Sequence, residues 1–82
     1  MRNDADIIGT EVVAIAYITF SEIGIYGMGK LIDSNEDHYT VEVADIDDKK
    51  ILVECDSVTP IGNWASFVDE TDAEVKRIPY NS

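Results

Sequence analysis

Residues that build covalent or catalytic sites are scarce in this sequence. Its 82 residues include one cysteine, Cys55, and one histidine, His38. A single cysteine makes no disulfide within the chain, so we expect a reducing compartment and a buried, structural thiol. A Cys–His or Ser–His–Asp device would have to use His38, which lies in an acidic turn with no nucleophile next to it in sequence. We therefore expect no enzymatic activity and no catalytic residue.

Long apolar runs are also missing. No run of about 18 apolar residues is present, and the start of the chain, MRNDADII, lacks the basic beginning and apolar core of a signal peptide. These absences favour a cytoplasmic protein that does not contact a membrane. A chain of this length forms one domain, 1–82, that is too small for a deep enzyme cleft. Residues 1–6 are polar and expected to be a flexible tail.

Positive charge is the third shortage. Six Lys and Arg face seventeen Asp and Glu, which gives a formal net charge of -11. A field of this sign repels nucleic acid and anionic membranes, and it attracts basic protein surfaces, including those that normally hold DNA or RNA. The alternative is that the acidity only confers solubility.

The residues that are plentiful predict a mainly β fold. Extended runs rich in β-branched and aromatic residues occur at 11–20, 30–34, 38–46 and 51–61, and short polar turns separate the last three. Such turns predict an antiparallel meander, because parallel strands need longer crossovers. The run at 11–20 has few polar residues on either side, so both of its faces should be covered.

The last part of the chain has two interpretations. Apolar residues recur at helical spacing from Trp64 onward, and Thr71 with Glu74 matches a capping box, which predicts a short helix at about 72–78. Alternatively, the segment 74–78, EVKRI, forms a closing strand.

Three glycines at 21–29 interrupt the strand pattern and predict an irregular connection. Gly24 and Gly29 have the spacing of a phosphate-binding loop and Lys30 follows them, but Leu31 replaces the hydroxyl residue that holds magnesium. The sequence after them alternates like strands, whereas a phosphate loop requires a helix there. Backbone bends in a tightly curved sheet are the better explanation.

The segment 26–61 follows one pattern: a G-x-G-x-L strand, a turn, a Y-x-V-x-V strand, a second turn, another strand and a final apolar turn. The matching positions are Gly27, Gly29, Leu31, Tyr39, Val41, Val43, Ile51, Val53, Val58 and Ile61. This pattern resembles the Tudor, Agenet and KOW group of small Src-homology-3-like barrels. The resemblance implies an antiparallel five-stranded barrel, with 11–20 as its first strand, 21–28 as a long loop, and a short C-terminal helix or closing strand.

In that group, aromatic residues near the loops hold a methylated Lys or Arg by cation–π attraction. The resemblance makes Tyr17, Tyr26, Tyr39 and Trp64 the candidates for such a cage. Core packing is the alternative for Tyr39 and Trp64.

Carboxylates are concentrated at 31–48, where no Lys or Arg interrupts them. They are Asp33, Glu36, Asp37, Glu42, Asp45, Asp47 and Asp48. A second group consists of Asp69, Glu70, Asp72 and Glu74. Both groups on a compact scaffold would imitate the phosphates of a nucleic acid. A calcium loop that began at Asp45 would place Lys49 and Lys50 where a ligand and a glycine are needed, so we expect no metal and no cofactor.

We therefore expect a non-enzymatic acidic binding protein that occupies a basic, nucleic-acid-binding surface of a partner protein. Phage-type inhibitors and DNA mimics of the anti-restriction or anti-CRISPR kind act in this way. Its contacts would come from the seven carboxylates at 31–48 and from Tyr26. One alternative is a Tudor-like module that binds a basic or methylated peptide, and another is an assembly protein that dimerises through a strand edge in the apolar run 12–20.

Overall fold

Six strands and one helix make up the described part of the protein, which is mainly β. The computed structural model describes residues 7–45 and 47–80, so the expected tail at 1–6 lies outside the described residues. In chain order the elements are β1 (Glu11–Ile18), β2 (Glu22–Ser34), β3 (Tyr39–Ala44), β4 (Lys50–Cys55), β5 (Ser57–Pro60), α1 (Ile61–Thr71) and β6 (Glu74–Arg77).

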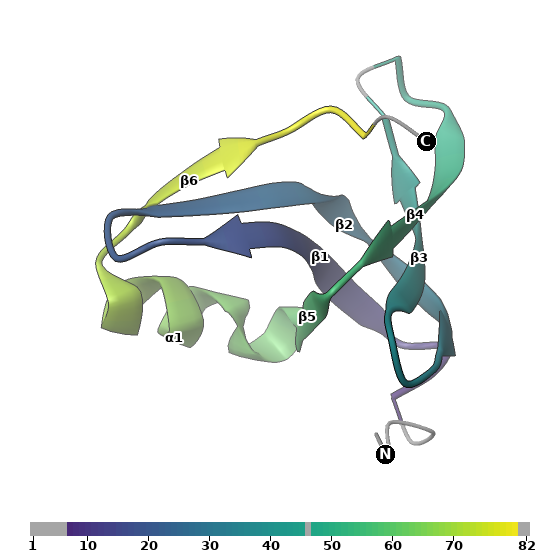
Figure 1. The fold of residues 1–82 in the computed structure, drawn as a ribbon, viewed down its shortest axis with the longest axis horizontal. Helices are drawn as coiled ribbons and strands as arrows, with labels where there is room; N and C mark the ends of the chain where they lie inside the picture. The colour runs from purple at the N-terminus through teal and green to yellow at the C-terminus, as the bar shows by residue number, and fades with distance from the viewer. Residues whose placement is uncertain (1–6, 46, 81–82) are drawn as a thin grey trace.

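The strands form one sheet with the order β4-β3-β2-β1-β5 (Figure 1). Neighbours in this order are antiparallel, so the predicted meander is confirmed. The first part of β2 pairs with β6 in parallel, and its last part pairs with β3 on the same side. The mainly β class is confirmed, but the described strands do not close into a barrel: β6 adds a sixth strand to the expected five, and the sheet ends at β4 and β5.

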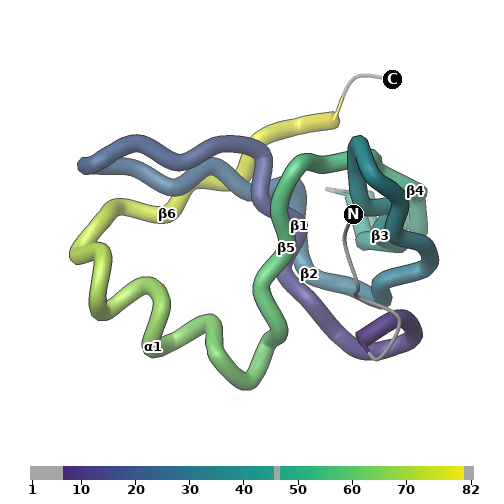
Figure 2. The backbone as a smooth tube through the Cα atoms, turned by 60° about the horizontal axis from the view of Figure 1, so that its bottom comes forward, coloured from purple at the N-terminus to yellow at the C-terminus, as the bar shows by residue number. Residues whose placement is uncertain are grey.

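Two hydrophobic cores lie on the two faces of β1. Val12 and Ala14 share one core with Val53 of β4, although two strands lie between them in the sheet, so the sheet curls around this core. Val13 and Ile15 point to the other face, where the aromatic side chains of α1 cover them. Figure 2 shows α1 and β6 at one end of the molecule and β3 and β4 at the other. Both faces are therefore covered at residues 12–15, as predicted, whereas the second half of the run exposes Tyr17, Ile18 and Phe20.

The segment 21–29 was expected to be an irregular connection, and this expectation is wrong, because β2 runs through it as a strand. The glycines are needed for close packing within the sheet. A Cβ atom on Gly29 would lie 1.7 Å from the Glu42 carbonyl oxygen of β3, and one on Gly24 would lie 2.5 Å from the Tyr17 ring. Glycine in a strand often marks such a close approach, which supports the sheet explanation of the glycines.

At the C-terminal end, the helix forms earlier than the predicted 72–78, and the closing strand is the correct alternative for 74–78. Helix α1 begins after Pro60 and ends at Thr71, where Asp72 takes a left-handed conformation and its amide donates to the Val68 carbonyl. The capping-box match was misleading because the seven residues 72–78 before Pro79 are too few for a stable helix. Pairing with β2 satisfies their backbone groups instead.

Candidate partner-binding surface

The turn between β2 and β3 holds the first group of predicted site residues. The side-chain oxygen of Asn35 accepts hydrogen bonds from the amides of Asp37 (2.8 Å) and His38 (3.0 Å). The Asn35 amide donates to the His38 carbonyl at 3.0 Å and closes the turn. An asparagine that bonds its own turn in this way fixes the loop. The turn therefore holds Glu36 and Asp37 on the surface in one defined arrangement.

Strand pairing adds two further carboxylates to this end of the sheet. Asp33 of β2 lies opposite Thr40 of β3, and Thr40 lies opposite Glu54 of β4. Residues opposite each other in a sheet point to the same face, so Asp33 and Glu54 flank Thr40 on the outer face. We call Asp33, Glu36, Asp37 and Glu54 the acidic end. Sequence reasoning missed Glu54, and pairing the strands of the predicted hairpin in register would have found it.

His38 lies beside the acidic end. Its Nε2 atom is 3.1 Å from a carboxylate oxygen of Glu54 and 3.3 Å from the Asn35 amide nitrogen. No described Lys or Arg forms an ion pair with Asp33, Glu36 or Asp37. Three of the four carboxylates at the acidic end therefore have no Lys or Arg partner in the described part of the chain.

The turn between β3 and β4 holds the second group, and here Asp45 has a structural task. One of its carboxylate oxygens accepts hydrogen bonds from the amides of Asp47 (2.8 Å) and Lys49 (2.9 Å). The Asp48 amide donates to the Asp45 carbonyl at 3.0 Å, and Asp48 itself has a positive φ of 66°. Only Asp47 and Asp48 of this turn have carboxylates without such a role.

Glu42 lies between the two turns, in the middle of the outer face. It is opposite Lys30 of β2 and Leu52 of β4, and the Lys50 amine is 4.0 Å from its carboxylate. Glu42 therefore has two lysines, Lys30 and Lys50, as neighbours, and it does not belong to the acidic end. Six of the seven predicted carboxylates thus form two groups at opposite ends of β3, with Glu42 between them, and not one continuous ridge (Figure 1). A six-residue strand places these ends about 20 Å apart.

The second predicted group, Asp69, Glu70, Asp72 and Glu74, lies at the C-terminal end of α1 and the start of β6. Glu74 is opposite Glu22 of β2, and its amide donates to the Ser21 carbonyl at 3.1 Å. Glu22 accepts a hydrogen bond from the Tyr17 hydroxyl and pairs with the Lys76 amine at 2.9 Å. The hydrogen bond from Tyr17, then that from Lys76, lowers the pKa of Glu22, and the same contacts raise the pKa of Tyr17 and of Lys76.

The four candidate cage residues are not brought together. Tyr17 lies near the β1–β2 hairpin, Tyr39 packs against the core of β3, and Trp64 of α1 stacks on Phe67 with ring centres 5.7 Å apart. The core interpretation of Tyr39 and Trp64 is therefore supported by their packing. Tyr26 lies elsewhere, at a register shift of β2 against β1.

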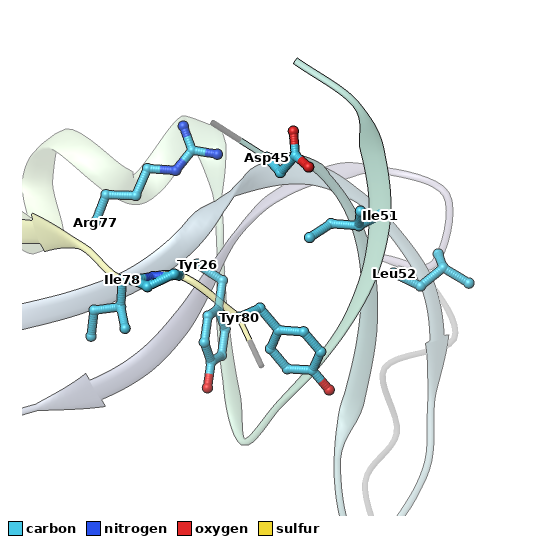
Figure 3. Close-up of a pocket in the computed structure, with 8 residues that line it drawn as sticks. Tyr26, Asp45, Ile51, Leu52, Arg77, Ile78 and Tyr80 are labelled. Carbon is cyan, nitrogen blue, oxygen red and sulfur yellow. The ribbon is translucent and has the colours of Figure 1, made fainter. Parts of the chain in front are cut away.

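Tyr26 lines a hollow of about 420 Å³ (Figure 3). Its ring meets that of Tyr80 edge to face, with centres 5.0 Å apart and planes at 89°. Most of the lining is apolar or aromatic, with one acid and one base among the residues: Tyr26, Asp45, Ile51, Leu52, Arg77, Ile78, Pro79 and Tyr80. Sequence reasoning found Tyr26 and Asp45 but not Tyr80, whose proximity depends on the course of the chain after β6.

Phe20 is another feature that the sequence did not single out. It lies in the β1–β2 turn and is 97% exposed. The Thr19 amide donates to the Glu22 carbonyl at 2.8 Å across this turn, so the exposed ring sits on a closed hairpin.

The described residues include no group of three or more His, Cys, Asp or Glu side chains placed to hold a metal ion. They also include no helix with the length and apolarity needed to cross a membrane. Comparison with known proteins gives no match to a family model, a curated protein or a solved structure. The fold and surface together define a mainly β protein with an open, curled sheet and an acidic end.

Proposed function

We propose that the protein is a non-enzymatic binding protein whose acidic surface occupies a basic, nucleic-acid-binding surface of a partner protein. The observation that supports this proposal is the acidic end, where the Asn35 turn fixes exposed carboxylates that have no Lys or Arg partner in the described chain. Carboxylates held together in this way repel one another, and cationic side chains of a partner would relieve that repulsion. The proposal needs no cofactor, metal or direct contact with nucleic acid.

A phage-type inhibitor of restriction, CRISPR or transcription machinery would use its surface in this way, as a DNA mimic. A reducing cytoplasm is the compartment that we propose, because Cys55 is buried and is the only cysteine in the chain. Because the two acidic turns lie at opposite ends of β3, they would contact the partner at two separate places. The acidic end is the main contact in this proposal, and the turn that contains Asp47 and Asp48 is a second one.

Salt dependence and a matched charge control test the proposal together. A partner captured from lysate and purified should bind far more weakly when salt rises from 0.1 to 1 M, over which the screening length falls from about 10 to about 3 Å. The triple variant Asp33→Asn, Glu36→Gln, Asp37→Asn removes three charges from the acidic end. The control variant Asp69→Asn, Glu70→Gln, Glu74→Gln removes three charges from the other end of the molecule.

Binding should be lost in the first variant and retained in the second. Equal losses in the two variants would mean that only net charge matters, and binding that does not change with salt would contradict the proposal outright.

The Tudor-like alternative stays a prediction, and the positions of its four aromatic residues on separate elements give it little support. The dimer through the apolar run 12–20 depended on an exposed edge in that run. This alternative also stays a prediction, and it has little support at residues 12–15, which are buried in β1 between β2 and β5.

A further inference from the structure

The hollow lies between β4 and the end of the described chain. On one side is β4, the last strand in the sheet order, and on the other is the segment 77–80, which continues from β6. The Ile78 amide donates to the Ile25 carbonyl at 2.7 Å, so this segment still follows β2 where the hollow begins. In Figure 3, Ile51 points from β4 toward the hollow, whereas Leu52 points away from it. Leu52 therefore borders the hollow mainly through its backbone.

A ligand that binds at this place must meet two requirements, one set by the edge of β4 and one set by the hollow. No described strand pairs with the outer side of β4, and unpaired strand edges present amide and carbonyl groups that another extended chain can satisfy. The hollow beside this edge has a largely apolar lining and a volume of about 420 Å³, which is within the range of sites that hold ligands. An extended polypeptide meets both requirements, since its backbone pairs with β4 while alternate side chains enter the hollow.

The other strand edges are less suitable. Strand β6 has four residues, and three of them are the charged residues Glu74, Lys76 and Arg77, which blunt an edge. Strand β5 also has four residues and ends in Pro60, which has no amide to donate. Strand β4 has six residues without proline. It is thus the longest edge and the only described one of the three with an apolar hollow beside it.

Charge indicates what kind of segment fits. The chain carries a net charge of -11, Asp45 lines the hollow, and Asp47 and Asp48 follow in the same turn. Of the nearby cations, the Arg77 guanidinium donates to the Ala44 carbonyl and Lys50 pairs with Glu42, whereas Lys49 is exposed in the same turn as the three aspartates. Two copies of so acidic a chain repel each other. The segment should therefore come from a different protein and carry Lys or Arg.

We propose that the outer edge of β4 at residues 50–54, with which no described strand pairs, binds an extended basic segment of another protein as an added strand, together with the hollow lined by Tyr26, Ile51 and Tyr80. This site goes beyond the acidic end, which acts through charge alone and lies at the other end of β3. It also differs from a cage for one cationic group, because the Tyr26 and Tyr80 rings contact each other edge to face.

The test uses three synthetic peptides of about seven residues, enough to run along a six-residue strand. The first alternates lysine and valine, the second alternates glutamate and valine, and the third is the lysine peptide with every second backbone nitrogen methylated. Amide hydrogen exchange by NMR reports which backbone groups each peptide protects. Tyr80→Ser removes one wall of the hollow, and Phe20→Ser is the matched control, because it removes an exposed aromatic ring elsewhere.

The lysine peptide should slow exchange in β4 and not in β5, and the other two peptides should not. Tyr80→Ser should weaken its binding by about tenfold, whereas Phe20→Ser should leave it unchanged. Equal protection by the glutamate peptide or by the methylated peptide would overturn the proposal. So would the absence of protection in β4, or protection that grows with protein concentration alone, which would mean that a second copy occupies the edge. None of these results depends on the acidic end, so the proposed function stands or fails separately.

Discussion

Replacing Gly29 by alanine tests the close approach of β2 and β3 on which both surfaces depend. The added Cβ would lie 1.7 Å from the Glu42 carbonyl oxygen, whereas real Cβ atoms almost never lie within 3.0 Å of another heavy atom. The obstacle is backbone, so no side-chain rotation relieves it. The two strands must therefore separate at this point, and their nearest hydrogen bonds must break.

The expected loss of stability follows from what this separation disturbs. Two backbone hydrogen bonds contribute about 0.5–1.5 kcal/mol each. Displacing the neighbouring core residues Leu31 and Val43, which are at most 1% exposed, adds about 1–3 kcal/mol. The total is about 2–6 kcal/mol, and a domain of this size has only about 4–12 kcal/mol in all. Gly29→Ala should thus lose a large part of its free energy of unfolding.

Urea unfolding, followed by the fluorescence of Trp64, measures this change against a control of the same chemistry. Gly62 lies in the exposed first turn of α1, and a Cβ there meets nothing within 4 Å. Gly62→Ala should stabilise the protein by about 0.5–1 kcal/mol, because alanine favours the helix. If Gly29→Ala unfolds within about 0.5 kcal/mol of the original protein, the strand register and the explanation of the glycines are both refuted.

Three further predictions concern the other end of the molecule. Asp72→Gly should raise the free energy of unfolding by about 0.5–1 kcal/mol, because Asp72 has a positive φ of 51° that glycine adopts without strain; no rise in a urea titration would contradict this. Glu70→Lys should raise it by about 0.3–1 kcal/mol, since α1 has no basic residue in its last turn to complement its dipole; Glu36→Lys, outside any helix, is the control. Glu22→Gln should lower the free energy of unfolding only between two pH limits. Because the pKa of Glu22 is lowered in the folded protein, the stability that Glu22 contributes is present above pH 4.5 and is lost as pH falls below that value. Because the pKa of Tyr17 is raised, the stability that Tyr17 contributes is present below pH 10.0 and is lost as pH rises above it. Unfolding curves across this range that show the same difference at every pH would contradict the network.

Local pattern predicted the strands whose alternation is clear, and it failed where distant contacts decide the structure. The alternation of Val41 and Val43 with polar neighbours placed β3 and its buried face correctly. Gly24 and Gly29 look like breaks when only the chain around them is considered, because the side chain and the backbone that exclude a Cβ belong to Tyr17 and Glu42. The segment after Thr71 resembles a helix start until β2 offers it a parallel partner.

The candidate surface was predictable to the same degree. The carboxylates around Asn35 and Asp45 follow from composition and turn chemistry alone. The distance between the two groups of carboxylates depends on β3, because one acidic turn lies at each end of this strand. The pairing of Tyr26 with Tyr80 depends on where the chain goes after β6, more than fifty residues along the sequence, and no pattern within either segment encodes it.

The acidic end and the outer edge of β4 differ in the force that each can use, and this difference makes them separable. Contacts of exposed carboxylates weaken as salt rises, because mobile ions screen them. Strand pairing beside an apolar hollow depends on backbone hydrogen bonds and buried area, and screening affects these far less. A partner that uses both surfaces would lose only part of its affinity in high salt. Removing Tyr80 would then weaken the part that remains, whereas neutralising Asp33, Glu36 and Asp37 would weaken the part that salt removes.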